Sequence, residues 1–232
     1  MYGIIEQGST GLPPSVPFSQ PKNLFRYGEQ TLWSTQLLAS NSAIANASFR
    51  LFTTPLGQQG QGFLNALSIG ETNLKEGGRI PNGIAYDVFG IACQVGVAEG
   101  QESAGTVAVL GAPIDTAAEI DTLVDIQSNG VLKWDFTQTQ VDIAPIQLVG
   151  AGGGLFGSVS LSSEPLGTIG AMNNGAGSVW LYRKHPVALP GSSTFSILLQ
   201  FGSRAAAIPD NNVDFFVKVA LLGYYKNVIE IG

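Results

Sequence analysis

Short runs in which apolar and polar residues alternate dominate this chain of 232 residues. In such a run every second side chain points to the same face, which is the pattern of a half-buried β-strand. The clearest runs cover residues 194–201 and 215–222, and Gly, Pro, Asn or Ser stands between the runs. Roughly ten short strands separated by turn residues are typical of a β-sandwich or a barrel. The alternation therefore predicts an all-β fold.

The same alternation predicts several further strands. Residues 31–45 are also compatible with a helix, but their content of Thr and Ser favours a strand. The remaining strands are predicted at 48–53, 84–95, 106–110, 131–136 and 179–182, with weaker patterns at 137–143 and 155–161.

A β-hairpin is predicted around Asn129-Gly130, with strands at 120–127 and 131–136. An Asn-Gly pair between alternating runs is the strongest short-range hairpin signal, because both residues tolerate a positive φ. Residues 116–119 have the sequence Thr-Ala-Ala-Glu, a capping pattern that favours a short helix at the start of the same stretch. A single helical turn is predicted at 63–67, after a Gly-rich segment.

The first 22 residues form a different region, an extended N-terminal arm. Pro13, Pro14, Pro17 and Pro21 exclude a helix and impose extended backbone geometry. Residues 23–232 contain neither an internal repeat nor a linker, so they are predicted to form one β domain. Long loop insertions into this domain are expected near 55–80 and 140–175, where the strand pattern is interrupted or weak.

Charged residues make up only 12% of the chain, about half the share of an ordinary soluble domain. A surface with so little charge favours a subunit that neighbouring subunits enclose on most sides. The net charge of −6 argues against a dedicated nucleic-acid binder, which needs clustered Lys and Arg. The densest basic run, Arg183-Lys184-His185, is interpreted as a solvated strand end.

Residues suited to catalysis or metal binding are scarce. The chain has one Cys, Cys93, and one His, His185, so an intrachain disulfide and a thiolate zinc site are both excluded. Cys93 lies in an apolar run and is predicted to be a small buried side chain. We therefore predict no catalytic residue, no metal ligand and no cofactor, and expect that the protein is not an enzyme.

One carboxylate cluster is the alternative to this expectation. Asp115, Glu119, Asp121 and Asp125 are close in sequence, and Asp121 and Asp125 would share one face of a strand. Such a pair could serve a glycan hydrolase, or the group could bind calcium. Solvated acids in a strand and its turns are the favoured interpretation.

Two Gly-rich segments carry no chemistry of their own. Residues 57–62 lack the Gly-Lys-Ser/Thr ending of a phosphate loop, and residues 151–157 are interpreted as a loop, although Gly with Leu and Phe also occurs in segments at bilayer interfaces. Residues 71–79 hold much of the local charge and are predicted to form an exposed turn. The uncharged stretch 143–161 contains Pro145 and several Gly, so we predict no transmembrane helix there.

The chain resembles the jelly-roll capsid proteins of tailless icosahedral viruses, particularly the small ones of phages and archaeal viruses. The resemblance lies in the Pro-rich arm, the Gly-rich domain of low charge, and the paired strands Ser193–Gly202 and Val213–Gly223 followed by Tyr224-Tyr225-Lys226-Asn227-Val228-Ile229. It implies a jelly roll that stands upright in a virion shell, self-assembly into trimers or pseudo-hexameric capsomers with other capsid proteins, and in many cases an internal membrane beneath the shell. Assembly in the host cytoplasm and no strong contact with the genome are expected.

The length of the chain favours one jelly roll over two. Eight strands of typical length with their loops need roughly 130 to 180 residues, so a compact double roll would leave every loop near its minimum. The alternative function is a trimeric β-sandwich spike or head that binds a receptor or carbohydrate, with Trp33, Trp134 and Trp180 stacking on sugars. Because Trp134 and Trp180 lie within predicted strands, core packing is the favoured role for them.

Overall fold

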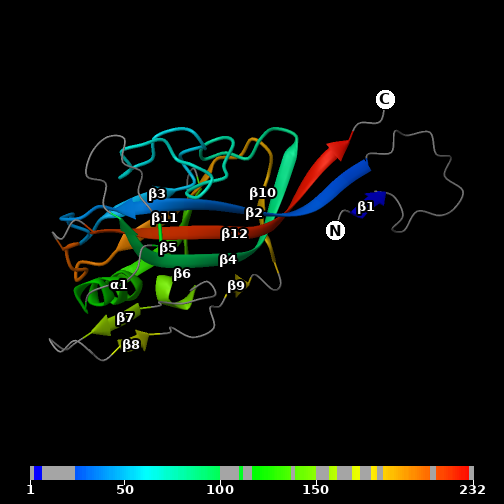
Figure 1. Ribbon diagram of the computed structural model, residues 1–232. Helices are drawn as coiled ribbons and strands as arrows, with labels where there is room; N and C mark the ends of the chain where they lie inside the picture. The colour runs from blue at the N-terminus through cyan, green and yellow to red at the C-terminus, as the bar shows by residue number, and fades with distance from the viewer. Residues whose placement is uncertain are drawn as a thin grey trace, which may run out of the picture.

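The structure is a computed structural model in which the chain is mostly β-sheet (Figure 1). It describes residues 3–6, 24–99, 110–111, 117–136, 139–149, 157–160, 169–172, 179–181, 185–209 and 213–229. The strands are β1 (Gly3–Glu6), β2 (Leu24–Leu38), β3 (Ser48–Leu51), β4 (Ile84–Glu99), β5 (Gly130–Phe136), β6 (Thr139–Pro145), β7 (Gly157–Ser160), β8 (Ile169–Met172), β9 (Trp180–Leu181), β10 (Val187–Leu189), β11 (Phe195–Phe201) and β12 (Val213–Ile229). The helices are α1 (Ala117–Asn129) and a short 3-10 helix, η1 (Ile146–Leu148).

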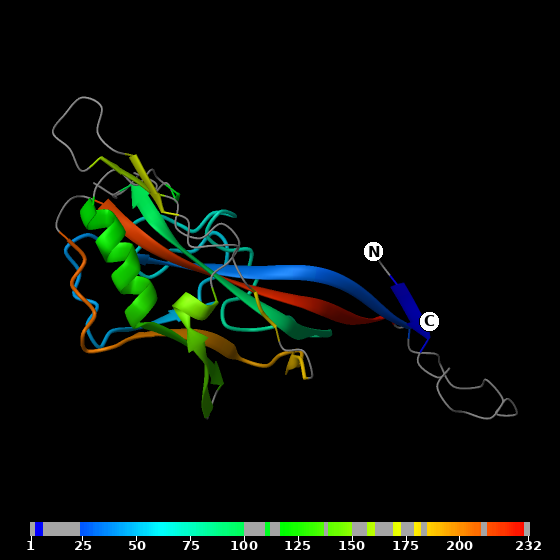
Figure 2. The same ribbon diagram turned by 90° about the horizontal axis from the view of Figure 1, so that it is seen from below.

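Two antiparallel sheets form the body of the protein. The large sheet has the order β1-β2-β12-β4-β10, with β9 also paired to β4, and the small sheet has the order β3-β11-β5-β6. Figure 2 shows the two sheets as two layers, with α1 at one end between them. A separate pair of strands, β7 and β8, lies beside this body. The prediction of an all-β sandwich is therefore confirmed at this level.

The hydrophobic core fills the space between the two sheets. Phe215, Val217 and Val219 of β12 and Ile197 and Leu199 of β11 are all completely buried in one cluster. Each of these residues lies two positions from the next, so one face of each strand points into the core. The alternation that predicted strands at 194–201 and 215–222 is confirmed by this arrangement.

Most of the other predicted strands are also present. The strand interpretation of 31–45 is confirmed as far as Leu38, where β2 ends. Residue ranges 48–53, 84–95, 131–136, 137–143, 155–161 and 179–182 overlap with β3, β4, β5, β6, β7 and β9, respectively. Of the strand predicted at 106–110 only Leu110 is described, and it forms an isolated bridge with Ala98.

The strand predicted at 120–127 is wrong, because these residues belong to α1. Leu123 and Ile126 are completely buried, and Glu119 and Thr122 are buried beside them. These buried residues are spaced so that they lie on one face of a helix, with steps of three and four. The same stretch also has apolar residues at steps of two, which is the pattern of a strand. The alternative signal, the capping pattern just before this stretch, is the one that agrees with the structure.

Asn129-Gly130 is consequently a junction between helix and strand rather than a hairpin turn. The Asn129 side chain donates a hydrogen bond to the Asp125 carboxylate at 2.7 Å within the last turn of α1. A Cβ atom on Gly130 would lie 2.4 Å from the Ile146 side chain and 2.8 Å from the Ile126 carbonyl oxygen. The glycine therefore allows a close approach of backbone and core, and β5 pairs with β6 and β11.

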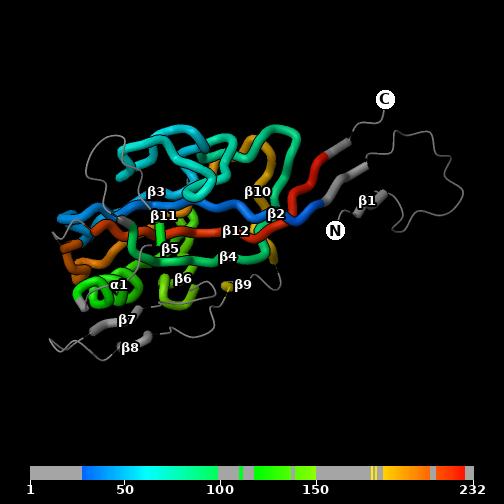
Figure 3. The backbone as a smooth tube through the Cα atoms, viewed as in Figure 1, coloured from blue at the N-terminus to red at the C-terminus, as the bar shows by residue number. Residues whose placement is uncertain are grey.

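Residues 52–83, between β3 and β4, form a long connection without a helix or a named strand. This connection lies along β2 (Figure 3). The helical turn predicted at 63–67 is therefore wrong. The exposed turn predicted at 71–79 is wrong in part, because Glu71, Thr72 and Leu74 are buried. In the other predicted insertion, 140–175, the described residues include β6, which belongs to the small sheet.

Tyr86 of β4 fastens three strands of the large sheet to one another. Its buried hydroxyl lies 2.8 Å from the Leu221 carbonyl oxygen of β12 and 2.5 Å from the Gln30 carbonyl oxygen of β2. The Tyr86 ring passes close to the backbone of Gly223, and a Cβ atom added to that glycine would lie 2.5 Å from Tyr86 Cζ. Burial raises the pKa of the hydroxyl well above its ordinary value, so Tyr86 stays protonated and acts as a donor.

Tyr86→Phe is expected to lower the free energy of unfolding by about 1–2 kcal/mol, because the Leu221 and Gln30 carbonyl oxygens lose the one O–H group that they share. The folded-state pKa lies above the unfolded value of 10.0, so this stabilisation is complete below pH 10 and declines above it. Urea unfolding at neutral pH measures the difference. Tyr224→Phe, which removes an exposed hydroxyl, is the matched control, with an expected change within about 0.5 kcal/mol. Equal effects of the two substitutions would contradict the bridging role.

Candidate functional site on the outer face of the large sheet

The outer face of the large sheet carries features that the core does not explain. Along β12 the residues between the core positions point outward, and they include Phe216, Lys218, Ala220, Leu222 and Tyr224. The strand therefore presents apolar residues on both faces, and Lys218 is the one charged residue among these five. A surface of this kind needs a cover or a partner.

The connection of residues 52–83 covers one part of this face by attaching itself to the edge of β2. The Asn73 side chain accepts a hydrogen bond from the Trp33 backbone N–H at 2.9 Å and donates one to the Thr31 carbonyl oxygen at 2.7 Å. Thr35 Oγ1 donates to the Glu71 carbonyl oxygen at 2.8 Å, and Thr72 Oγ1 donates to the Trp33 carbonyl oxygen at 3.1 Å. These bonds replace a neighbouring strand, so this stretch of the β2 edge is protected from pairing with another chain.

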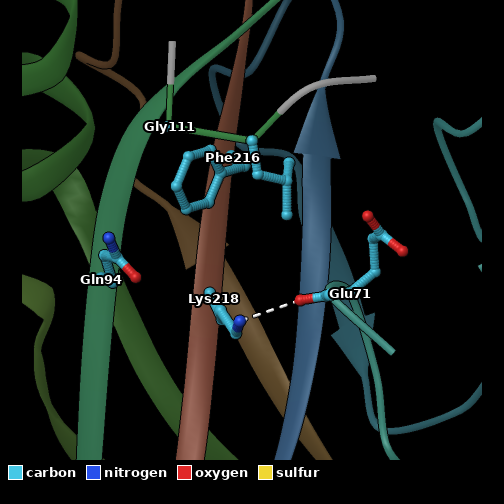
Figure 4. Close-up of a pocket in the computed structure, with 7 residues that line it drawn as sticks. Glu71, Gln94, Gly111, Phe216 and Lys218 are labelled. Atoms are coloured by element: carbon cyan, nitrogen blue, oxygen red, sulfur yellow. Dashed lines mark hydrogen bonds between the residues drawn. The ribbon is translucent and has the colours of Figure 1, made fainter. Parts of the chain in front are cut away.

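A cavity of about 370 Å³ lies where this connection meets the sheet. Figure 4 shows Gln94 on β4 and Phe216 and Lys218 on β12 along one side, with Glu71 across from Lys218. The Lys218 ammonium group donates to the Gly70 carbonyl oxygen at 2.8 Å and lies 5.7 Å from the centre of the Trp33 ring. The lysine thus holds the connection against the sheet.

The electrostatics of the cavity do not provide a pair of groups for proton transfer. Burial lowers the pKa of Lys218, and the negative charge of Glu71 opposes this shift. The Glu71 carboxylate turns away from the lysine (Figure 4) and accepts hydrogen bonds from the backbone N–H and the hydroxyl of Ser68. Lys218 and Glu71 therefore both serve to anchor residues 68–71, and we assign this cavity a structural role.

A partly exposed apolar patch lies further along the same face. We name it the outer patch: Phe89, Val179, Leu181, Leu222 and Tyr224. Leu181 is 48% exposed and Tyr224 is 42% exposed, while the rings of Phe89 and Tyr224 are in contact with their centres 4.9 Å apart. The outer patch therefore joins residues of β4, β12 and the β9 segment into one surface.

Gly90 of β4 lies between two groups of outer-patch residues, Val179 and Leu181 on one side and Leu222 on the other. Leu222 and Leu181 are the register partners of Gly90 on its two sides. A Cβ atom on this glycine would stand 2.8 Å from Val179 Cγ1, 3.3 Å from Leu181 Cδ2 and 3.6 Å from Leu222 Cβ. The side chains of residues 179 and 181 therefore lie over the β4 backbone and continue the apolar surface across the sheet.

The outer face of the small sheet has the opposite character. Arg50 forms an ion pair with Asp135 at 3.2 Å, and Lys133 forms one with Asp142 at 3.1 Å. These charged residues come from β3, β5 and β6 and lie on both sides of the β11 residue Leu198. Surface ion pairs add little stability, but they keep a face hydrated. Two ion pairs thus lie on the outer face of the small sheet, and the outer patch lies on the large sheet.

The carboxylates considered for catalysis do not form a site. Asp121 and Asp125 lie one turn apart on α1, so the shared strand face predicted for them is wrong. The Asp125 carboxylate accepts hydrogen bonds from the Ala206 backbone N–H at 2.7 Å and from Asn129, and thereby ties α1 to the loop after β11. Glu119 is buried in α1, while Asp115 lies outside the described residues.

Cys93 is 2% exposed in the core between the sheets, as predicted, and burial raises the pKa of its thiol to about 12. His185 is exposed, and Arg183 and Lys184 lie outside the described residues. Trp134 is 3% exposed in the core, which confirms its packing role and removes it from any sugar-binding surface. The Trp33 indole N–H donates to the Ile69 carbonyl oxygen at 3.0 Å.

Within the residues that the structure describes, no group of three or more His, Cys, Asp or Glu side chains could hold a metal ion. The described part of the chain also contains no helix that is long and apolar enough to cross a membrane. Of the Gly-rich segment at 151–157 only Gly157, the first residue of β7, is described.

Comparison with known proteins gives no match to a family model, to a curated protein or to a solved structure.

The outer patch was not predicted from the sequence. Its signal is the stretch Ala220–Tyr225, which contains no charged residue and is apolar on both strand faces. A continuous apolar run of this kind is typical of a strand that is covered on both sides. The contribution of Val179 and Leu181 could not be predicted in this way, because it depends on the pairing of β9 with β4.

Proposed function

We propose that this protein is a structural subunit of a virion shell, a capsid protein that assembles with copies of itself and performs no catalysis. The observation that carries the proposal is the order in which the strands pair. It is supported by the contrast between the outer patch and the charged outer face of the small sheet.

The strand order supports a single jelly roll as the fold of this subunit. The first strand of the sandwich, β2, pairs with the last, β12; β3 pairs with β11, β4 with β10, and β5 with β6. This nested antiparallel pairing is what results when one long hairpin is rolled into two sheets, as in the eight-stranded jelly roll of many viral capsid proteins. All eight strands belong to one nested set of pairs in one sandwich, which favours one jelly roll over two.

The surface supports assembly. A chain with 12% charged residues and an exposed apolar patch is poorly suited to life as an isolated monomer. Neighbours that cover the outer patch would remove its apolar surface from water, which is the main driving force for association. The hydrated face of the small sheet is then free to point toward solvent. Trimers or pseudo-hexameric capsomers, formed with or without other capsid proteins, are the assemblies we propose.

The charge balance bears on what the shell encloses. A net charge of −6 disfavours direct binding of the genome, whose phosphates repel an acidic surface. We therefore propose that a membrane or a separate basic protein lies between this subunit and the genome.

Sedimentation velocity over a range of protein concentrations tests the proposal. We expect the purified protein to pass from small oligomers to large closed particles as its concentration rises, and electron microscopy of the heavy fraction identifies shells. Discrete trimers that do not grow at any concentration would favour the alternative, a soluble receptor- or carbohydrate-binding module. A monomer at every concentration would exclude both.

A further inference from the structure

We propose that Asn82-Gly83 is a site of spontaneous covalent modification, at which the asparagine side chain loses ammonia and becomes aspartate or isoaspartate. The reaction starts when the backbone nitrogen of the following residue attacks the side-chain amide carbon. Glycine is the residue that hinders this attack least, because it has no side chain. The inference does not depend on the proposed function, since the reaction is intramolecular and needs only water.

The structure describes two Asn-Gly pairs, and their surroundings are opposite. Asn82 and Gly83 are both exposed in a turn just before β4, whereas Asn129 is half-buried and Gly130 is buried at the junction of α1 and β5. The third Asn-Gly pair of the sequence, at 174–175, lies outside the described residues. The same dipeptide can therefore be compared in two environments of one chain.

The backbone after Asn82 leaves the attacking nitrogen accessible. A hydrogen bond from the Ile84 backbone N–H to the Pro81 carbonyl oxygen, at 3.3 Å, closes the turn, and Gly83 has a φ of +80°. A Cβ atom added to Gly83 would have no heavy atom within 4 Å apart from its chain neighbours. Among the described residues the Gly83 N–H has no hydrogen-bond partner. Its nitrogen can therefore react without first losing a hydrogen bond.

The Asn82 side chain is oriented by a contact that the reaction does not break. The Ser192 hydroxyl donates a hydrogen bond to Asn82 Oδ1 at 3.3 Å. This oxygen stays on the amide carbon throughout, and the hydroxyl stabilises the negative charge that develops on it during the attack. The nitrogen that leaves, Asn82 Nδ2, has no hydrogen-bond partner among the described residues.

The reaction balances with water as the only co-reactant. A bond forms from the Gly83 nitrogen to Asn82 Cγ, the bond from Cγ to Nδ2 breaks, and ammonia leaves with the proton of the Gly83 N–H. Water then adds to one of the two carbonyl carbons of the cyclic imide. Opening on one side gives aspartate in the normal backbone, and opening on the other side gives isoaspartate, whose backbone is longer by a methylene group. Either product adds a negative charge.

Asn129 is held against the same reaction. Its side-chain nitrogen donates to the Asp125 carboxylate at 2.7 Å and to the Asp125 carbonyl oxygen at 3.3 Å. The Asn129 carbonyl oxygen accepts a hydrogen bond from the Gly202 N–H at 3.1 Å, and Gly130 packs closely against Ile146. The junction must open before a cyclic imide can form there, and only the opened fraction reacts.

The modified turn lies where the connection of residues 52–83 enters β4. The Ser192 N–H donates to the Ile80 carbonyl oxygen at 2.9 Å, and the Ile80 N–H donates to the Ser193 carbonyl oxygen at 3.3 Å. The chain before the turn is thus tied to the segment after β10. Isoaspartate lengthens the backbone between this tied segment and Ile84, so we expect the turn hydrogen bond to Pro81 to be lost.

Incubation of the purified subunit at neutral pH, followed by mass spectrometry of its peptides, tests the proposal. Cleavage after glutamate places Asn82 in residues 77–99 and Asn129 in a peptide that begins at residue 120. We expect conversion of amide to acid at Asn82, with isoaspartate among the products, at least ~10-fold faster than at Asn129. In urea, where the fold is lost, the two rates should become similar.

Asn82→Gln is the matched control, because glutamine would have to close a larger ring, which forms far more slowly. The peptide 77–99 of this variant should gain no acid, which also excludes the exposed Gln94 as the source. Acid in that peptide of the variant would overturn the proposal. So would equal rates at Asn82 and Asn129 in the folded subunit, or reaction at Asn82 only after unfolding. The isolated subunit is used throughout, so a failure to form shells would not affect the result.

Discussion

Phe215→Ala is expected to lower the free energy of unfolding by about 3–5 kcal/mol, the largest stability loss that we predict for this chain. Phe215 is completely buried on the central strand β12, which pairs with both β2 and β4. Its ring lies in the core cluster that joins the two sheets. Removing it leaves a cavity whose walls are strands held by pairing on both sides, so the site cannot collapse to fill the space. Thermal and urea unfolding measure the effect.

The neighbouring residue Phe216 provides a matched control. It is 2% exposed but belongs to a small separate cluster with Leu37, Phe63 and Leu67 on the outer face. Phe216→Ala should therefore cost less global stability and should instead loosen the connection of residues 52–83. Limited proteolysis should then cut within that connection before the sandwich unfolds. Equal loss of stability in the two variants would contradict the division into one main core and one satellite cluster.

Replacing Leu181 and Tyr224 together by Asp is expected to abolish assembly while the subunit stays folded. Both side chains are more than 40% exposed, so the new charges are hydrated in the isolated subunit. In an interface the same charges would be buried without partners, at a cost of several kcal/mol for each contact. Concentration-dependent sedimentation should show loss of large particles, and circular dichroism should show the unchanged β-sheet signal.

Val124→Asp is the control for this pair of substitutions. Val124 is 40% exposed on α1, away from the outer patch, so the variant adds one carboxylate at a similarly exposed apolar site. We expect it to assemble normally. If the Leu181 and Tyr224 variant assembles as well as the unsubstituted protein, the outer patch is not an interface. If both variants fail to assemble to the same extent, the loss cannot be assigned to the outer patch.

The two sheets could be predicted from the sequence because their strands bury one face. Ile197 and Leu199 on β11, and Val217 and Val219 on β12, follow the spacing of two that a half-buried strand requires. The hairpin at Asn129-Gly130 was wrongly predicted because Ile120–Gln127 satisfies spacings of both two and three to four. Burial of Leu123 and Ile126 against the core decides in favour of the helix, and burial is a tertiary property.

The outer face shows the limit of sequence reasoning more clearly. The cover over β2 depends on the Asn73 amide group, which bonds to backbone groups some forty residues earlier in the chain. Nothing in a local pattern distinguishes this asparagine from one in an exposed turn, and residues 71–79 were predicted as such a turn. The outer patch likewise requires strand order: Leu181 and Leu222 become neighbours only because both oppose Gly90.

The structure shows which part of the surface the low content of charged residues concerns. It predicted that much of the surface is covered by neighbours, without indicating which part. The ion pairs of Arg50 with Asp135 and of Lys133 with Asp142 place charge on the outer face of the small sheet. The outer patch lies on the opposite side, so the surface that we expect to be covered is a defined one.

A cryo-electron microscopy map of particles assembled from the purified protein is the direct test of whether the subunit forms a shell through the outer patch. We predict a closed shell in which Leu181 and Tyr224 lie at contacts between neighbouring copies and the outer face of the small sheet stays hydrated. A shell in which the outer patch faces solvent would contradict the assignment of the interface. Protein that forms no shell under any assembly condition would contradict the proposed function itself.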